Sequence, residues 1–328
     1  MTNPKQSVKR RNRLVMIILL GLLSVAFPFF AGEYVIHILV LCWLLAISSI
    51  GWNICYGYAG LLSFGHAVFF GLSAYITLWL RVSPFQITPW IGVFIAASIA
   101  GGLGILVTLV TIKTSGIYFA LTTFALPQIL IIIFTTFWQI TGGAYGVIVP
   151  YTEESPYLMY FGNPMFYYYI ALAFLISVLL LQMKLCDSKL GYCLRAIRSD
   201  EAAANSLGID PFKTRILGLT ISAFVTGLSG GVFVNFLKFI DPVEAFGWTR
   251  NIQMVLGGVV GGVGTIFGPV IGVLIIVPLS EIMKLIVERQ FQGLNLVING
   301  LILMAVIVLL PEGVYPRLKR FLEKYLGG

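Results

Sequence analysis

Long apolar runs separated by short polar stretches dominate the pattern of this 328-residue chain. A helix needs about 20 apolar residues to cross the hydrocarbon core of a bilayer, and most of these runs reach that length. We interpret them as helices, because a helix satisfies its own backbone hydrogen bonds in lipid. The pattern predicts ten membrane segments, at about 14–31, 34–54, 63–80, 88–112, 116–138, 165–183, 214–237, 250–264, 266–286 and 295–310.

The predicted fold class is therefore an all-α, polytopic helical membrane protein. Segment 250–264 is short for a full crossing, so it is either a span or half of a re-entrant hairpin with segment 266–286. The number of crossings stays even in both cases. The expected organisation is a basic N-terminal tail (1–13), a transmembrane domain (14–310) and a C-terminal tail (311–328).

The composition agrees with a membrane protein and excludes several other classes. The chain is 59% hydrophobic and 10% charged, with a mean hydropathy of +0.96, whereas soluble domains are about 25% charged. This excludes a soluble enzyme, a disordered chain and a small disulfide-stapled module. The four cysteines include no CxxC spacing, so neither a disulfide framework nor a metal site is expected.

The positive charges predict the orientation of the chain. The net charge of +8 would suggest nucleic acid in a soluble protein, but here the charge lies in loops beside the membrane. With the N-terminus in the cytoplasm, 16 of the 21 Lys and Arg residues fall on the cytoplasmic side. Basic loops stay inside, so we expect both termini to be cytoplasmic and no nucleic-acid partner. The run 14–31 lacks an A-x-A cleavage site, so it is expected to be an uncleaved span.

Two common energy sources have no recognisable site in this sequence. No GxxxxGK[ST] motif is present, and the Gly-rich stretch 261–268 lacks its lysine, so the chain has no P-loop for ATP. Glu281, near the outer end of its segment, is the one carboxylate within a predicted span, whereas ion-driven carriers hold carboxylates near the midplane. The glycines repeat every four residues, which favours close helix packing over a role in lining a pathway.

A short motif raises a different class, the intramembrane serine protease. The sequence Gly227-Leu-Ser-Gly230 resembles the GxSG of that class. A serine nucleophile needs a base, and the two histidines, His37 and His66, both lie upstream, whereas the histidine of that class follows the serine. The match is therefore weak, and catalytic residues are not expected.

The loop 184–215 is the longest polar connection that we place in the cytoplasm. Asp200 and Glu201 suit a helix N-terminus, three alanines follow, Gly208 suits the position after the helix, and Pro211 comes next. We therefore expect a short exposed helix at 200–208. It either fits a groove of another protein or lies on the bilayer surface.

Two polar interruptions are candidates for the translocation pathway. Ser63, Gly65 and His66 interrupt the apolar start of the third segment, and His66 either lines a path or hydrogen-bonds a neighbouring backbone. The second interruption is Thr141, Gly142 and Gly143 at the outer mouth, where a simple turn is favoured over a contact for substrate or a delivering protein.

Four ordered motifs resemble those of branched-chain amino acid ABC permeases of the LivM type, in the LivH/LivM family. They are the G-x-x-S-x-G-H-A-x-F-F-G-x-x-A-Y pattern at 60–75, Thr-Gly-Gly at 141–143, Leu-Arg-Ala-Ile-Arg at 194–198 with Glu-Ala-Ala at 201–203 and Gly208, and the Gly-rich stretch 256–269. The general importer motif has three residues between its second Ala and its Gly, and this chain has four.

The resemblance implies one permease subunit of a type II ABC importer, in the cell membrane of a prokaryote. Its partners would be a sister permease, two cytosolic ATPases that use ATP and Mg²⁺, and an extracytoplasmic substrate-binding protein; this chain would bind no cofactor and no metal. The implied ATPase-coupling residues are Arg195, Arg198, Glu201, Ala202, Ala203 and Gly208, and the implied pathway residues are Ser63, Gly65, His66, Thr141, Gly142 and Gly143.

The resemblance implies a branched-chain or related amino acid as substrate. Permeases for urea, short amides and other small organic solutes also belong to the family and remain alternatives. A self-contained channel or facilitator is the alternative from another class.

Overall fold

The computed structural model describes residues 24–82, 85–111, 116–150, 153–287 and 312–326, with Ile17, Gly21, Gly300, Leu301 and Met304. The predicted segment 295–310 lies mostly outside these residues, segment 14–31 lies partly outside them, and the tail 1–13 lies wholly outside them.

Each of the eight predicted segments between residues 34 and 286 corresponds to a helix. These helices are α2 (Glu33–Asn53), α3 (His66–Arg81), α4 (Pro89–Thr111), α5 (Ile117–Thr136), α7 (Pro164–Cys186), α10 (Pro211–Leu237), α12 (Trp248–Gly261) and α13 (Gly268–Val287). Within the described residues, five are long and apolar enough to span a membrane: α2 with its continuation to Tyr58, α4, α5, α7 and α10. The prediction of a polytopic all-α membrane protein is confirmed, apart from two short strands.

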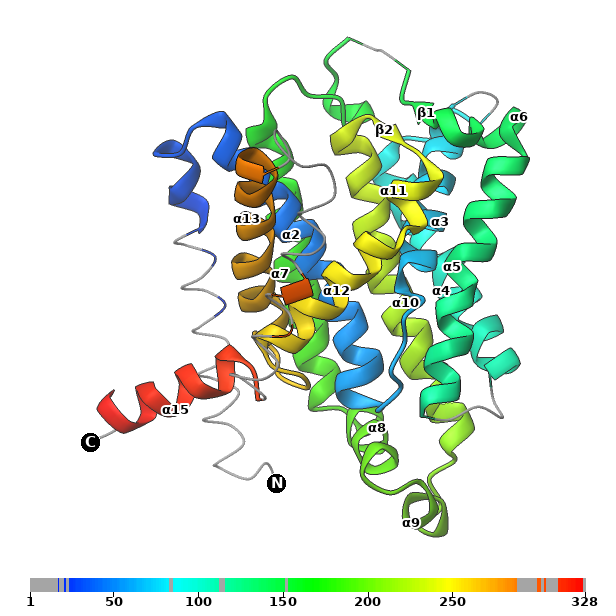
Figure 1. The fold of residues 1–328 in the computed structure, drawn as a ribbon, viewed down its shortest axis with the longest axis vertical. Helices are drawn as coiled ribbons and strands as arrows, with labels where there is room; N and C mark the ends of the chain where they lie inside the picture. Colours follow the sequence, from blue (N-terminus) through cyan, green and yellow to red (C-terminus); the bar gives the residue numbers. More distant parts are fainter. Residues whose placement is uncertain are drawn as a thin grey trace.

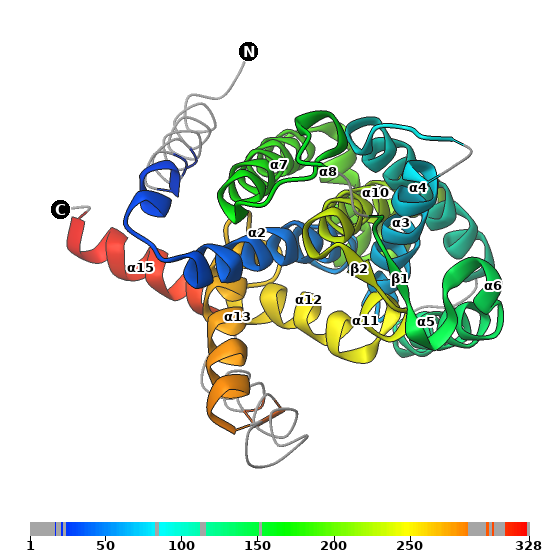
Figure 2. The same ribbon diagram turned by 90° about the horizontal axis from the view of Figure 1, so that it is seen from above.

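Helix α10 runs through the centre of the bundle, against α2, α3 and α4 (Figure 2). Its glycines allow this position: a Cβ on Gly230 would overlap the carbonyl oxygen of Phe70, and one on Gly227 would lie 3.0 Å from Ala97 Cα. Small residues let helix backbones approach closely in membranes. Between them, the Ser229 hydroxyl donates to the Leu44 carbonyl at 2.6 Å. The GxSG-like motif is therefore a packing motif, and neither histidine hydrogen-bonds to its serine.

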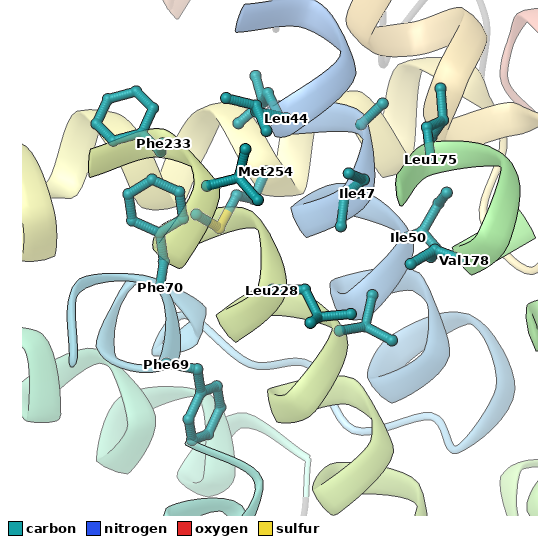
Figure 3. Packing of buried hydrophobic residues seen from close by; sticks show 14 of the residues in the cluster. Leu44, Ile47, Ile50, Phe69, Phe70, Leu175, Val178, Leu228, Phe233 and Met254 are labelled. Carbon is teal, nitrogen blue, oxygen red and sulfur yellow. The ribbon is translucent and has the colours of Figure 1, made fainter. Parts of the chain in front are cut away.

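The bundle interior is filled by large apolar side chains from helices far apart in the sequence (Figure 3). The rings of Phe70 on α3 and Phe233 on α10 lie 5.1 Å apart, near Met254 of α12. On the other side of α2, Ile50 approaches Val178 of α7. Lipid is as apolar as these side chains, so dispersion contacts and complementary shape hold such a bundle together.

The two ends of the bundle carry different elements (Figure 1). One end, here called the β end, holds the short helix α6 (Trp138–Thr141) and strands β1 (Val147–Ile148) and β2 (Phe239–Ile240), which pair antiparallel. The opposite end, here called the α9 end, holds α8 (Lys189–Ser199), α9 (Glu201–Ser206) and α15 (Val314–Leu326). The predicted C-terminal tail thus contains a helix, which packs beside the α12–α13 turn.

Shorter turns connect these helices: η1 (Phe27–Phe29), the π-helical turn η2 (Ile54–Tyr58), η3 (Gly143–Tyr145), η4 (Pro156–Leu158) and α11 (Pro242–Phe246). Helix α11 comes directly before α12 and shows how the chain around the predicted segment 250–264 crosses the bundle.

The chain descends from the β end in two pieces, α11 and then α12, and α13 returns (Figure 1). The Asp241 side chain caps α11, accepting from the amides of Val243 and Glu244 at 2.8 and 2.9 Å, and Gly247 separates the two helices. The α12–α13 turn reaches the far end of α2, where the Gly264 amide donates to Asn53 Oδ1 at 2.8 Å. The stretch 242–261 therefore crosses the bundle as a broken helix, so it does not turn back midway.

The glycines of α12 and α13 pack the two helices backbone to backbone. A Cβ on Gly261 would overlap the Gly268 carbonyl oxygen, and one on Gly272 would overlap the Gly257 carbonyl oxygen. This confirms the packing interpretation of the four-residue glycine repeat.

Candidate functional site

The cytoplasmic loop of the prediction forms two helices, α8 and α9. The Asp200 side chain caps α9 by accepting from the Ala203 amide at 2.9 Å. Leu207 ends the helix, and Gly208 follows with a φ of +82°, a conformation that favours glycine. Both signals in the sequence are confirmed, although the helix is shorter than the predicted 200–208.

Helix α9 presents a small apolar surface to solvent. Ala202, Ala203 and Leu207 are exposed, Leu207 by 82%, whereas Ala204 is buried. An ion pair between Glu201 and Arg215, at 2.6 Å, ties α9 to α10. The exposed group Ala202, Ala203 and Leu207 is here called the α9 face, and it suits contact with another surface.

A second helix cap, Asp210, follows α9 in the chain and lies at the start of α10. Hydrogen bonds from the backbone amide of Lys213, opposed by some desolvation, hold the pKa of Asp210 below its usual value. The Phe212 amide donates to the same oxygen at 3.0 Å. An ionised carboxylate at a helix N-terminus stabilises the helix.

Arg195 and Arg198 point toward this chain's own backbone. Arg195 Nη2 donates to the Cys186 carbonyl at 2.9 Å, and its guanidinium lies over the Tyr192 ring. Arg198 Nη1 donates to the carbonyl of Gly57, in the π-helical turn η2. Such turns open the regular hydrogen-bond ladder and are frequent at functional sites.

The end of α2, next to the Gly57 carbonyl that Arg198 contacts, also bonds to the α12–α13 turn. Asn53, one turn before Gly57, donates from Nδ2 to the Thr265 carbonyl at 2.8 Å and accepts from the Gly264 amide. A Cβ on Gly264 would lie 3.2 Å from Arg198 Nη1. Helix α8, the end of α2 and the α12–α13 turn thus meet at one point, here called the Arg198 junction.

The polar interruption before α3 is an irregular stretch whose backbone groups find partners in other helices. Trp52 Nε1 donates to the Ser63 carbonyl at 2.9 Å, and the Phe64 amide donates to Thr123 Oγ1 at 3.1 Å. The Ala67 amide donates to Asn251 Oδ1 at 3.4 Å. Non-helical backbone is tolerated at membrane depth when protein surrounds it in this way.

His66 is fully buried between two serine hydroxyls. Ser222 donates its hydroxyl proton to the Gly51 carbonyl at 2.6 Å, so its oxygen accepts from His66 Nε2 at 2.8 Å. His66 Nδ1 then accepts from Ser63 Oγ at 3.1 Å, and this network assigns the tautomer. Both partners of His66 are serine hydroxyls, whereas the sequence analysis offered a neighbouring backbone group.

Thr141, Gly142 and Gly143 form a turn. Thr141 is buried and donates from Oγ1 to the Phe137 carbonyl at 2.9 Å, while the two glycines have φ values of +74° and +58°. Only glycine adopts such angles without strain. The turn interpretation therefore accounts for both glycines.

A cavity of about 850 Å³ opens between α2, α5, α10, α11, α12 and α13. This volume lies within the range of small-molecule sites. Apolar and polar residues line it in similar numbers; the polar ones are His37, Gln128, Glu244, Thr249, Arg250, Gln253, Ser280 and Glu281. Ser63, Gly65, His66, Thr141, Gly142 and Gly143 are absent from this lining, and their role in a pathway stays a prediction.

Arg250 of this cavity is not among the candidate site residues of the sequence analysis. Its side chain is 13% exposed, pairs with the Glu244 carboxylate, and stacks on the Phe233 ring at 4.5 Å. Glu244 lies outside the predicted spans, and it brings a second carboxylate to the cavity beside Glu281. A lone arginine at the start of a short apolar segment was the available signal, because intramembrane charge marks functional sites. Within the described residues, no three His, Cys, Asp or Glu side chains gather to hold a metal.

A bundle of apolar helices long enough to span a membrane, with a partly polar cavity and a short exposed helix at one end, is the architecture of a polytopic membrane protein. The chain belongs to the family of permease components of branched-chain amino acid transport systems, which matches residues 34–309. It is therefore a transport subunit.

Relatives within and around this family carry different names. The LivM permease protein of the high-affinity branched-chain amino acid transport system of Escherichia coli is 26% identical, over 93% of this chain and 75% of that protein. The LivH permease protein of Salmonella typhimurium is 22% identical, over 83% of this chain and 91% of that protein. The L-arabinose transport system permease protein AraH of Escherichia coli is 30% identical over 34% of this chain and 35% of that protein. No solved structure matches the chain.

Proposed function

We propose that this permease subunit passes a branched-chain or related amino acid across the cell membrane of a prokaryote, driven by two cytosolic ATPases. The observation that carries the proposal is the α9 face, which lies at one end of the bundle and exposes Leu207 by 82%. An exposed apolar helix face beside basic residues suits a partner protein. The family to which the chain belongs supports the choice of substrate.

The ATPases would act through α9 on the spans. Motion of α9 passes to α10 through the Glu201–Arg215 ion pair and to α8 through the short connection at Asp200. Arg198 then carries it to the Arg198 junction, where α2 and the α12–α13 turn meet. Those helices line the cavity, so this route links ATP hydrolysis to access.

The α9 end faces the cytoplasm in this proposal, with both termini on that side. The excess of Lys and Arg in the loop 184–215 and the tails supports the orientation. A binding protein would deliver substrate at the β end. A sister permease would complete the cavity that six helices of this subunit line.

Reconstitution tests the proposal. The chain alone in liposomes is expected to move no amino acid, whereas the assembly of both permeases and both ATPases, supplied with ATP and the binding protein, is expected to accumulate L-leucine. Uptake by the chain alone would establish a self-contained channel. ATP-driven uptake of a sugar or urea, without uptake of leucine, would support an importer and refute the amino acid as its substrate.

A further inference from the structure

The cavity contains a buried cation with unused hydrogen-bonding capacity. The guanidinium of Arg250 lies over the rings of Phe233 and Phe70, at 4.5 and 5.3 Å from their centroids. Its Nε is buried and has no hydrogen-bond partner. A buried, unsatisfied donor on a charged group is costly unless an anion meets it, so the site is suited to a carboxylate.

The present partner of Arg250 is replaceable. Glu244 pairs with it from α11, across the break at Gly247, and the Glu244 side chain is 46% exposed. A half-exposed carboxylate loses little when it returns to water. Glu244 therefore occupies the position that the carboxylate of a ligand would take.

Backbone groups strengthen the same position. Gly247, Trp248 and Thr249 line the cavity beside Arg250, so the first turn of α12 lies at the cavity. Gly247 provides no side-chain cap there. Uncapped amides at the start of a helix bind anions, and the helix dipole adds to the attraction.

Helix α13 contributes a negative charge to the same cavity. Glu281 and Ser280 line the cavity, and the apolar side chains of Leu41, Leu45 and Val277 line it as well. The cavity thus offers a cation, an anion and an apolar surface. A neutral sugar or urea can hydrogen-bond to these groups but has no charge to pair with either, whereas an apolar α-amino acid carries all three complementary groups.

We propose that this cavity binds an α-amino acid as a zwitterion. Arg250 and the first turn of α12 receive its carboxylate in place of Glu244, Glu281 receives its ammonium group, and the apolar lining contacts its side chain. The proposal rests on the proposed function and specifies how the substrate is recognised within this subunit.

The test is equilibrium binding to the permease–ATPase assembly in nanodiscs, without the binding protein. The probes are L-leucine, leucinamide (which lacks the carboxylate) and 4-methylpentanoate (which lacks the ammonium group). L-Leucine is expected to bind at least fivefold more tightly than either analogue. Arg250→Gln should weaken leucine and 4-methylpentanoate at least fivefold and spare leucinamide, while Glu281→Gln should weaken leucine and leucinamide and spare 4-methylpentanoate.

Glu244→Gln separates ligand recognition from a structural ion pair. It frees Arg250, so leucine should bind more tightly, opposite to the effect of Arg250→Gln. A merely structural pair would make both variants weaken binding alike. Arg81→Gln is the matched control: it removes another buried arginine, bonded to Asn235 at 2.9 Å outside the cavity, and should leave the order of the three probes unchanged.

Equal binding of the three probes, no measurable binding, or variants that leave the order unchanged would overturn the proposal. ATP-driven leucine uptake by the same subunits, reconstituted in liposomes with the binding protein, is measured in parallel. Uptake with an unchanged probe order refutes the cavity assignment alone, whereas absence of amino acid uptake refutes the proposed function.

Discussion

His66 shows how a single polar side chain is accommodated among apolar helices. Its two ring nitrogens are both used, one by Ser222 of α10 and one by Ser63 before α3. Each of these hydrogen bonds replaces one that the side chain makes with water in the unfolded chain. The histidine therefore joins two segments with only a modest net gain in stability.

Replacing His66 by Ala should lower stability by about 1–3 kcal/mol, because buried hydroxyls lose a partner and a cavity forms. The midpoint of thermal unfolding in detergent measures the change. His37→Ala is the comparison, because His37 is half-buried and makes a ring contact with Phe236; its effect should be smaller. Unchanged unfolding together with lost uptake would instead favour the pathway role of His66.

At the scale of single elements, two helix surfaces differ in how well they tolerate an added methyl group. Helices α12 and α13 meet through the backbone of their glycines. In α4, by contrast, Gly102 faces open space, and an added Cβ there meets nothing within 4 Å. An added methyl group must therefore have opposite effects at the two places.

Gly272→Ala should destabilise the protein by about 1–3 kcal/mol, because the methyl group would collide with the Gly257 carbonyl oxygen and force α12 and α13 apart. Gly102→Ala, in α4, should stabilise it by up to about 1 kcal/mol by favouring the helix. Unfolding midpoints of both variants check the signs. Two equal values would mean that the α12–α13 contact is looser than described.

The α9 face gives the second prediction at this scale. Ala203→Arg places a bulky charge on an exposed helix surface, so ATPase co-isolation should fall at least tenfold without loss of stability. Ala203→Ser keeps the size of the side chain and should retain the ATPases. Full co-isolation of Ala203→Arg would remove α9 as the docking element.

At the scale of the whole molecule, the proposed coupling depends on the connection between the α9 end and the cavity. Arg198 donates to the Gly57 carbonyl, and Asn53, four residues earlier in the chain, bonds to Thr265 and Gly264 of the α12–α13 turn. From this junction, helices α2, α12 and α13 run to the cavity. Physical contact of this kind permits coupling, and a functional measurement demonstrates it.

Arg198→Gln should leave ATPase binding intact and reduce the number of substrate molecules moved per ATP at least fivefold, because the guanidinium bridge to Gly57 is lost. Uptake and phosphate release are measured on the same proteoliposomes. Lys189→Gln removes a positive charge from the same loop at an exposed position and serves as control. An unchanged ratio for Arg198→Gln would show that force passes by another route.

Local signals in the sequence predicted much of this architecture. The eight apolar segments between 34 and 286 match helices within a few residues, and Asp200 with Gly208 bounded α9. The cavity was missed because six separate helices assemble it, and neither Arg250 nor Glu244 signals that meeting alone. The two-residue strands were missed because their pairing joins Val147 to Ile240 across the fold.

The backbone contact between α12 and α13 also bears on how such proteins diversify. The two helices hold together through glycines, while Arg250, Gln253, Val277 and Glu281 point elsewhere, into the cavity. A lineage can therefore exchange the cavity side chains without disturbing the interlock that keeps the helices in register. Under the zwitterion proposal, adaptation to a new solute would then require few substitutions.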